Sequence, residues 1–505
     1  VIVKTYVPGG KFAIIDEKGN DVDYTIIKSR DLTDYVLSQT IMLDPSRKFY
    51  VPDQVLEVTM AIKANDVPAL GYVQYSIDTQ KDSHKETADK KVLENKYYTI
   101  EVEENGSLTI VDKANNETYK NQGILVENGD DGDSFNYSPP RKDMEVFSNE
   151  SKCTVKISGS DIYDQAEIHF DMVVPADLDE RAEGKVSVTM LVDMTVALRK
   201  DSKVIDFNVK VDNKGLSHRL CVLFDSQIVS AFNYADQQFG LIKRPNYYEK
   251  EMKLYMESMN NKTEKKAGIQ ELANWANDQS TWQEPPISIE PTQSYVSLTD
   301  GKTGIAVIPQ GVREYEVLDD SKIRLTLFRT YGFMGKENLI YRPGRASGER
   351  IIETPAAQLL KEMEFNFGFT SYAGDINDSD IDTLAKQYNT NLEVYTYAEF
   401  LNGRLIFSQR EIEGQNAKIH SLFETEGNLV VSAVKKAEED DGYIIRLYNG
   451  KDHKDLDDKI KFNFDIKEAY YTNLKEEKTE EIKVENNTIS VKELSHCKFV
   501  TIWVK

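Results

Sequence analysis

Ile205-Asp206-Phe207-Asn208-Val209-Lys210-Val211 is the clearest structural signal in this chain of 505 residues. Apolar side chains occupy every second position, and polar side chains lie between them. Because successive side chains of a β-strand point to opposite faces, the pattern predicts a strand with one buried and one solvated face. Leu56, Val58, Met60 and Ile62 likewise alternate with Glu57 and Thr59.

Short turn signals separate such stretches. Asn105-Gly106 lies between the alternating segments 98–102 and 108–110, and this pair tolerates the positive φ angles of a tight hairpin. Asp300-Gly301 and Asp441-Gly442 repeat the arrangement. Many strands joined by turns predict a mainly β fold of large antiparallel sandwiches.

Few segments have helical periodicity. The pattern predicts helices over 262–277 and over 379–388, the second opened by a capping box of Ser379 and Asp382. Thr354-Pro355 could begin another helix, but residues 364–369 alternate, so we expect a loop that leads into an edge strand. We place a small β domain at 1–79, a central sandwich at 80–372 and a C-terminal β-sandwich region at 373–505.

Charge and composition narrow the function. The net charge of −23 argues against a nucleic-acid partner and against anionic membranes, since both need concentrated Lys and Arg. The cysteines are Cys153, Cys221 and Cys497, too few and too scattered for a disulfide framework. We expect a cytoplasmic protein with no membrane span, and we leave a homo-oligomer open.

Common catalytic signatures are absent from the sequence. There is no Gly-x-Ser-x-Gly elbow, phosphate-binding glycine loop or Cys-x-x-Cys pair. His453-Lys454-Asp455 resembles a metal-ligand doublet, but it lies in a polar run without a second nearby histidine, so a solvated loop is expected. Paired carboxylates could hydrolyse a glycosidic bond, yet 85 acidic residues leave the pair undetermined.

The segment 323–348 is the best candidate for ligand contact. Arg329 ends an alternating strand and precedes a segment that carries Tyr331, Arg342 and Arg345 among glycines. Guanidinium groups next to flexible backbone suit the rim of a site for a polyhydroxylated or anionic ligand. The alternative is that these arginines face water and form weak surface pairs.

A second candidate is the acidic segment 128–140, which contains Asp133, Phe135 and Tyr137 and ends in Pro139-Pro140. Carboxylates and aromatic faces are what hydroxyl-rich rings require, so the segment could contact a sugar. The alternative is an ordinary Asx-rich turn.

Six short motifs follow one another along nearly the whole chain. They are Pro68-Ala69-Leu70-Gly71-Tyr72, Leu93-Glu94-Asn95-Lys96-Tyr97-Tyr98, the acidic segment ending Tyr137-Ser138-Pro139-Pro140, Ser217-His218-Arg219-Leu220-Cys221-Val222-Leu223-Phe224, Pro291-Thr292-Gln293-Ser294-Tyr295-Val296, and Leu327-Phe328-Arg329-Thr330 through Arg342-Pro343-Gly344-Arg345. In this order they resemble the C-terminal β region of glycoside hydrolase family 38, the retaining α-mannosidases, especially the bacterial branch that includes mannosylglycerate hydrolases.

The resemblance implies a fold and a site. It implies a galactose-mutarotase-like super-β-sandwich flanked by smaller β-sandwich domains. It also implies that Arg329 reaches toward a bound mannoside and that either Phe135 or Tyr137 lines the same pocket. Arg342 and Arg345 are carried over as residues of the same loop, and Asp133 as a residue of the acidic segment.

The chain also departs from the family. The family's zinc ligands, two His and two Asp, and its Asp nucleophile lie in an upstream domain, and their motifs have no counterpart at matching positions here. We therefore expect no catalytic or metal-binding residue, and a substrate shared with a missing N-terminal catalytic domain. Alone, the chain should be inactive. The alternative is an independent carbohydrate-binding or surface-interaction β protein.

Overall fold

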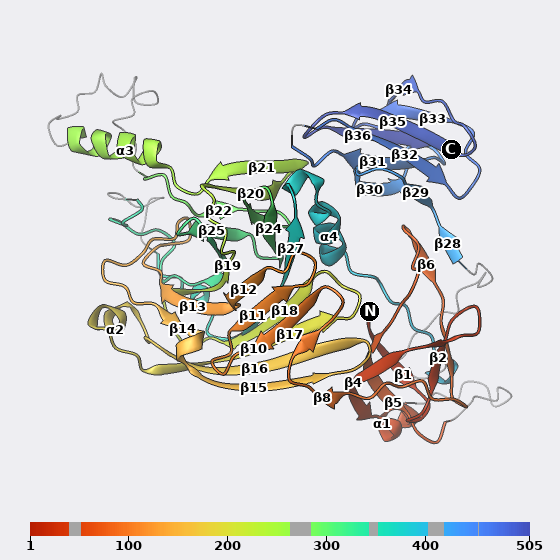
Figure 1. The fold of residues 1–505 in the computed structure, drawn as a ribbon, viewed down its shortest axis with the longest axis horizontal. Helices are drawn as coiled ribbons and strands as arrows, with labels where there is room; N and C mark the ends of the chain where they lie inside the picture. The colour runs from red at the N-terminus through yellow and green to blue at the C-terminus, as the bar shows by residue number, and fades with distance from the viewer. Residues whose placement is uncertain (40–51, 263–283, 343–351, 402–418, 453) are drawn as a thin grey trace. The chain divides into compact units, whose positions relative to one another are not determined.

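A computed structural model describes residues 1–39, 52–262, 284–342, 352–401, 419–452 and 454–505. The chain folds as two compact units, and Figure 1 shows the strands and helices that they contain. The sandwich unit comprises Lys91–Ile157 and Gln165–Asn389, and the terminal unit comprises Val1–Lys90, Ser158–Asp164 and Thr390–Lys505. Helix makes up only 10% of the structure, so the predicted mainly β fold with sandwich domains is confirmed.

The sandwich unit is built on one long antiparallel sheet. Its strands, in spatial order, are β21 (Gly240–Pro245), β20 (Phe232–Gln237), β23 (Val296–Thr299), β24 (Thr303–Gln310), β27 (Glu362–Ala373), β18 (Ile205–Asp212), β17 (Val188–Arg199), β16 (Tyr163–Val174) and β15 (Lys152–Gly159). The opening alternating stretch is β18, whose apolar residues are all buried, as predicted.

Two further sheets belong to the same unit. The facing sheet contains β14 (Val146–Phe147), β13 (Ile124–Gly129), β19 (His218–Asp225), β26 (Lys322–Arg329), β25 (Glu314–Leu318) and β22 (Glu290–Pro291). The small sheet contains β12 (Thr118–Gln122), β11 (Leu108–Asp112), β10 (Tyr98–Val102) and β9 (Leu93–Glu94).

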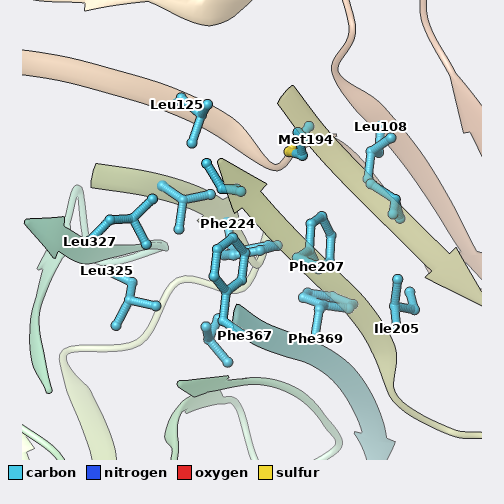
Figure 2. Packing of buried hydrophobic residues seen from close by; sticks show 14 of the residues in the cluster. Leu108, Leu125, Met194, Ile205, Phe207, Phe224, Leu325, Leu327, Phe367 and Phe369 are labelled. Carbon is cyan, nitrogen blue, oxygen red and sulfur yellow. The ribbon is translucent and has the colours of Figure 1, made fainter. Parts of the chain in front are cut away.

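The buried faces of the three sheets form one hydrophobic core, as Figure 2 shows. Phe207 of β18 stacks on Phe367 of β27 with ring centroids 5.2 Å apart, and Phe224 of β19 meets Phe207 edge-on at 5.4 Å. Aliphatic side chains such as Leu108 and Leu325 close the space around these rings. Apolar area removed from water is the main stabilising force here.

The predicted hairpin at Asn105-Gly106 joins β10 to β11, and Gly106 has φ +80°. A Cβ atom at Gly106 would lie 2.5 Å from the ring of Phe170, so glycine is required for space as well as for conformation. Asp300-Gly301 likewise joins β23 to β24, with Gly301 at φ +83°. Both predictions are confirmed.

One strand prediction needs correction. Residues 364–369 belong to β27, but β27 lies between β24 and β18 in the middle of the long sheet, so it is not an edge strand. Residues Pro355–Gln358 before it form a 3₁₀ turn. Alternation identified the strand, whereas its central place depends on partners far away in the sequence.

The terminal unit contains smaller sheets. The strands from the N-terminal part are β1 (Ile2–Val7), β5 (Leu56–Ile62) and β4 (Tyr24–Asp31) in one sheet, and β3 (Asp21–Val22), β2 (Ala13–Ile15) and β7 (Ser76–Asp78) in another. The strand β6 (Gly71–Val73) pairs with β28 (Ile419–Ser421), and β8 (Ala88–Asp89) pairs with Ser158 and Gly159.

The C-terminal part of that unit has two sheets around a core of its own. One contains β29 (Phe423–Thr425), β32 (Leu456–Phe462) and β35 (Thr488–Leu494). The other contains β30 (Val430–Lys436), β31 (Tyr443–Tyr448), β36 (Phe499–Val504), β33 (Ala469–Thr472) and β34 (Lys478–Glu481). The hairpin predicted at Asp441-Gly442 joins β30 to β31.

The α-helices in the described residues are α1 (Thr33–Ser38), α2 (Leu178–Glu183), α3 (Glu249–Lys262) and α4 (Ile381–Asn389). The helix predicted over 379–388 is confirmed as α4, with Ser379 Oγ accepting from the Ile381 N–H. The helix predicted over 262–277 falls almost wholly outside the described residues, after α3. No helix among the described residues combines the length and apolarity needed to cross a membrane.

Candidate functional site

The two candidate segments meet at one edge of the facing sheet. The strands β13 and β26 both pair antiparallel with β19, so they run in the same direction and end at the same edge. Gly129 at the end of β13 lies opposite His218, and Arg329 at the end of β26 lies opposite Arg219. Residues 129–140, here called the Asp loop, and residues 330–342 continue from these ends.

The Asp loop is folded by its own carboxylates. Asp130 accepts a hydrogen bond from the Gly132 N–H at 2.8 Å, and Asp133 accepts from the N–H groups of Phe135 and Asn136 at 3.0 and 3.2 Å. Short acidic side chains favour such turns. A Cβ atom at Gly132 would lie 2.0 Å from the Asn136 carbonyl oxygen, so the close turn requires glycine.

Arg329 fastens this loop to the end of β26. Its Nε and Nη2 donate to the two carboxylate oxygens of Asp130 at 2.6 and 3.1 Å. Nη2 also donates to the carbonyl oxygens of Asp133 and Asn136, both at 2.9 Å. Among the described residues, Nη1 has no hydrogen-bond partner, and 18% of the side chain is exposed. Arg329 therefore positions the loop and keeps one donor group for another partner.

Arg342 and Lys336 hold the other side of the loop. Arg342 is buried and pairs through Nη2 with the Asp133 carboxylate, and its Nη1 donates to the Asn136 side chain. The Lys336 N–H donates to Asp133 at 2.8 Å, and the Lys336 ammonium pairs with Asp131. Asp133 is thus a buried anchor within the loop and is turned away from solvent.

The two candidate aromatics have opposite environments. Tyr137 is buried, with the Arg219 guanidinium carbon 3.8 Å from its ring centroid and its hydroxyl accepting from Asn128 at 3.1 Å. Phe135 is 60% exposed. Among these aromatics, Phe135 is the one whose face a ligand from solvent can reach, whereas Tyr137 supports the loop from beneath.

Burial and ion pairing act against each other on these carboxyl groups. Burial raises the pKa of Asp133, but hydrogen bonds from Arg342 and from backbone N–H groups outweigh it, and the pKa is lowered. Burial raises the pKa of Asp130 above its ordinary value, although the hydrogen bonds and charge of Arg329 oppose the shift. Both follow from carboxylates held in a poorly solvated site.

Sequence reasoning located this edge but not all of its members. The structure brings together Arg329, Arg342, Asp133, Phe135 and Tyr137, while Arg345 lies outside the described residues. Asp130 and Lys336 were not singled out, although they anchor the loop as firmly as the residues that were. The signal for Asp130 was its place in the quoted acidic segment. Lys336 is an isolated lysine whose importance only its contacts reveal.

The expectation that this chain has no metal-binding residue stays a prediction. Within the described residues, no group of three or more His, Cys, Asp or Glu side chains is arranged to hold a metal ion. His453 lies outside those residues. The donor groups around Arg329 are engaged with arginine and backbone N–H groups, so they do not fit the two-His, two-Asp zinc set that the resemblance implies.

Two family models match this chain. Residues 93–333 match the model of the glycosyl hydrolases family 38 C-terminal domain, and residues 428–501 match that of the glycosyl hydrolases family 38 C-terminal beta sandwich domain. The chain belongs to glycosyl hydrolase family 38. The first match covers the Asp loop and Arg329, whereas Lys336 and Arg342 lie beyond its end at residue 333.

The chain is also similar to individual proteins. A protein of Halalkalibacterium halodurans, described as "Putative mannosylglycerate hydrolase", is 24% identical over 420 residues, covering 79% of this chain and 40% of that protein. A family 38 glycosyl hydrolase structure from Enterococcus faecalis superposes with a TM-score of 0.72 at 18% identity, covering all of this chain and 56% of its own.

An alpha-mannosidase structure from Enterococcus faecalis V583 gives a TM-score of 0.73 at 18% identity, over 100% of this chain and 54% of that chain. These likenesses support the fold. The chain spans about half the length, or less, of these three proteins.

Proposed function

We propose that this chain forms the C-terminal β part of an α-mannosidase-type glycoside hydrolase and that the Arg329 edge lines part of its sugar pocket. The observation that carries the proposal is the arrangement of Arg329, which holds the Asp loop through Asp130 and keeps Nη1 unpaired among the described residues. The same loop presents an exposed Phe135. A charged donor next to an aromatic face suits a sugar ring.

The catalytic groups are assigned elsewhere in this proposal. We infer that a zinc ion, its ligands and the nucleophile belong to an N-terminal catalytic domain that shares the α-mannoside with this edge. A retaining glycosidase needs a placed nucleophile and an acid/base carboxyl, and the carboxylates around Arg329 are engaged in holding the loop. The role proposed for this chain is therefore non-catalytic.

The test uses the full-length enzyme, encoded by the gene together with its sequence upstream of Val1. Arg329→Ala should lose roughly 1.5–3 kcal/mol of transition-state stabilisation, seen as a lower kcat/KM for an aryl α-mannoside, because a charge-assisted hydrogen bond is removed. Arg313→Ala is the matched control, since Arg313 is an exposed arginine of the same unit. Unchanged kinetics in Arg329→Ala would reduce Arg329 to a structural residue.

A second variant separates ligand contact from loop support. Phe135→Ala should lower kcat/KM while the free energy of unfolding changes by less than about 0.5 kcal/mol, because the side chain is exposed. Equal kinetics in Phe135→Ala and the parent enzyme would show that this loop does not line the pocket.

Expressed alone, the chain should neither bind stoichiometric zinc nor hydrolyse an activated aryl α-mannoside, and metal analysis with an activity assay checks both. The upstream sequence decides between this proposal and an independent carbohydrate-binding protein. A reading frame with the family's zinc motifs supports it, and a start codon close to Val1 contradicts it. A cytoplasmic location and homo-oligomer formation remain predictions.

A further inference from the structure

His496 and Cys497, at the turn between β35 and β36 of the terminal unit, lie next to Asp452 of the loop between β31 and β32. Cys497 Sγ is 3.1 Å from Nε2 of His496, and Nδ1 of the same ring is 3.3 Å from a carboxylate oxygen of Asp452. Cys497 is exposed, and the side chains of His496 and Asp452 retain 25% and 17% exposure. No step of the proposed glycosidase function uses these residues.

The order of the three groups defines a direction for proton transfer. The negative charge of Asp452 lies on the Nδ1 side of the ring, so it favours the imidazole tautomer with its proton on Nδ1. Nε2 is then the acceptor, and the Cys497 thiol is placed to donate to it. A thiol next to a base that a third group orients is the general arrangement of an activated nucleophile.

The backbone holds the two loops together. The Cys497 N–H donates to the Asn449 carbonyl at 3.1 Å, and the Asn449 N–H donates to the Lys498 carbonyl at 3.0 Å. The buried Asn449 side chain donates to the carbonyl oxygens of Lys454 and Leu494 at 2.6 and 2.7 Å. Asp452 and Cys497 therefore lie on loops that are tied to each other, and Cys497 adopts φ +58° there.

The other cysteines provide a comparison within the same chain. Cys221 is fully buried, and Cys153 is half-buried. Burial, together with the charge of Asp452, raises the pKa of Cys497, so its resting form is the thiol. Because the thiolate is the nucleophile, reaction at Cys497 needs a base at the moment of attack, and His496 is in place for that role.

We propose that Cys497 is a thiol–disulfide exchange site for low-molecular-weight disulfides, with His496 as its base and Asp452 as the residue that positions the base. In this exchange the Cys497 S–H proton moves to His496 Nε2, and Sγ attacks one sulfur of the disulfide. The disulfide S–S bond breaks as a new S–S bond forms. The departing thiolate takes the proton from His496, so the products are a mixed disulfide at Cys497 and a free thiol.

The experiment exposes the full chain to oxidised glutathione at neutral pH and follows the adduct by intact mass and peptide mapping. One glutathione should be found on Cys497, with Cys153 and Cys221 unmodified, and Cys497→Ser should abolish it. An adduct formed mainly on Cys153, or none, would overturn the proposal.

The rate of adduct formation at Cys497 shows whether His496 acts as a base or only supports the fold. In His496→Ala the rate constant for the Cys497 adduct should fall by about tenfold or more, because general-base assistance is lost. Added imidazole should restore part of the rate. Asp452→Asn should lower the rate and shift its pH profile, whereas His84→Ala, in the N-terminal part of the chain, should leave it unchanged. If His496→Ala folds normally and reacts at the parent rate, His496 is not the base and the proposal fails.

Discussion

The core of the sandwich unit and the edge around Arg329 are stabilised by different forces. In the core, rings such as Phe207 and Phe367 are buried among other apolar side chains from all three sheets. At the edge, Arg329 and Arg342 hold carboxylates and carbonyl groups through directed hydrogen bonds. Hydrophobic burial depends on area and volume, whereas charge-assisted hydrogen bonds depend on atom identity and angle.

The comparison predicts which substitutions each region tolerates. The core should accept another apolar residue of similar volume, because packing is recovered by small shifts. The edge should reject even a substitution that keeps the shape, since a buried donor or acceptor without its partner retains its desolvation penalty.

The largest loss in the free energy of unfolding is expected for a substitution in the core. Phe207→Ala should lower the free energy of unfolding by about 4 kcal/mol, since it removes a buried ring and leaves a cavity between Phe367 and Phe224. Denaturant titration measures the loss. Phe135→Ala is the exposed control and should stay within about 0.5 kcal/mol of the parent. A loss below about 1 kcal/mol for Phe207→Ala would mean that the sheets repack.

At the edge, Asp133→Asn keeps the shape but removes the charge that faces Arg342. The expected loss is about 3 kcal/mol, because a buried guanidinium loses its counter-charge. Asp319→Asn is the matched control, since Asp319 forms an exposed pair with Lys322, and it should change stability by less than about 1 kcal/mol. Equal effects of the two substitutions would show that the buried pair has no special importance.

The same pair predicts a pH dependence. The pKa of Asp133 is lowered in the folded state, so its contribution is fully present above the unfolded pKa, about 4, and disappears as pH falls through the folded value. The stability gap between the parent and Asp133→Asn should therefore be constant near neutral pH and narrow below about pH 4. Unfolding measured across this range checks it. A gap that widens in acid would contradict the assignment.

Arg329→Lys should lower the free energy of unfolding by an intermediate amount, about 2 kcal/mol. The reason is that an ammonium cannot reproduce the paired hydrogen bonds to Asp130. Arg313→Lys, on the exposed surface, should be nearly neutral by the same thermal or denaturant measurement. If both lysine variants are neutral, the fork geometry of Arg329 contributes nothing to stability.

The smallest change in the free energy of unfolding is expected for an ion pair that faces water. His169, on β16, lies 2.7 Å from Asp193 and 3.2 Å from Asp171, and 40% of its side chain is exposed. Hydrogen bonding to Asp193 raises its pKa. These contacts of His169 should contribute under about 1 kcal/mol to the free energy of unfolding. It is present below the unfolded pKa of about 6.5 and is lost as pH rises through the higher folded value.

His169→Gln measured at pH 5.5 and pH 9 tests this statement, with the larger loss expected at the lower pH. A loss as large as that of Asp133→Asn would break the distinction between buried and exposed pairs.

Local patterns in the sequence determined which segments become strands and turns. The alternation at 205–211 produced β18, Asn105-Gly106 produced the β10–β11 hairpin, and the pattern near 379–388 produced α4. These signals suffice because side-chain direction and turn conformation depend on neighbours within a few residues. The family motifs also predicted that Arg329 and the acidic segment belong together.

Only the tertiary structure decided what those segments contact. It placed β27 in the middle of the long sheet, buried Tyr137 beneath Arg219 while leaving Phe135 exposed, and turned Arg342 inward onto Asp133. Arg329 and Asp130 are separated by 199 residues in the sequence. Burial and ion pairing depend on such distant partners, and no local periodicity carries information about which residues the fold brings together.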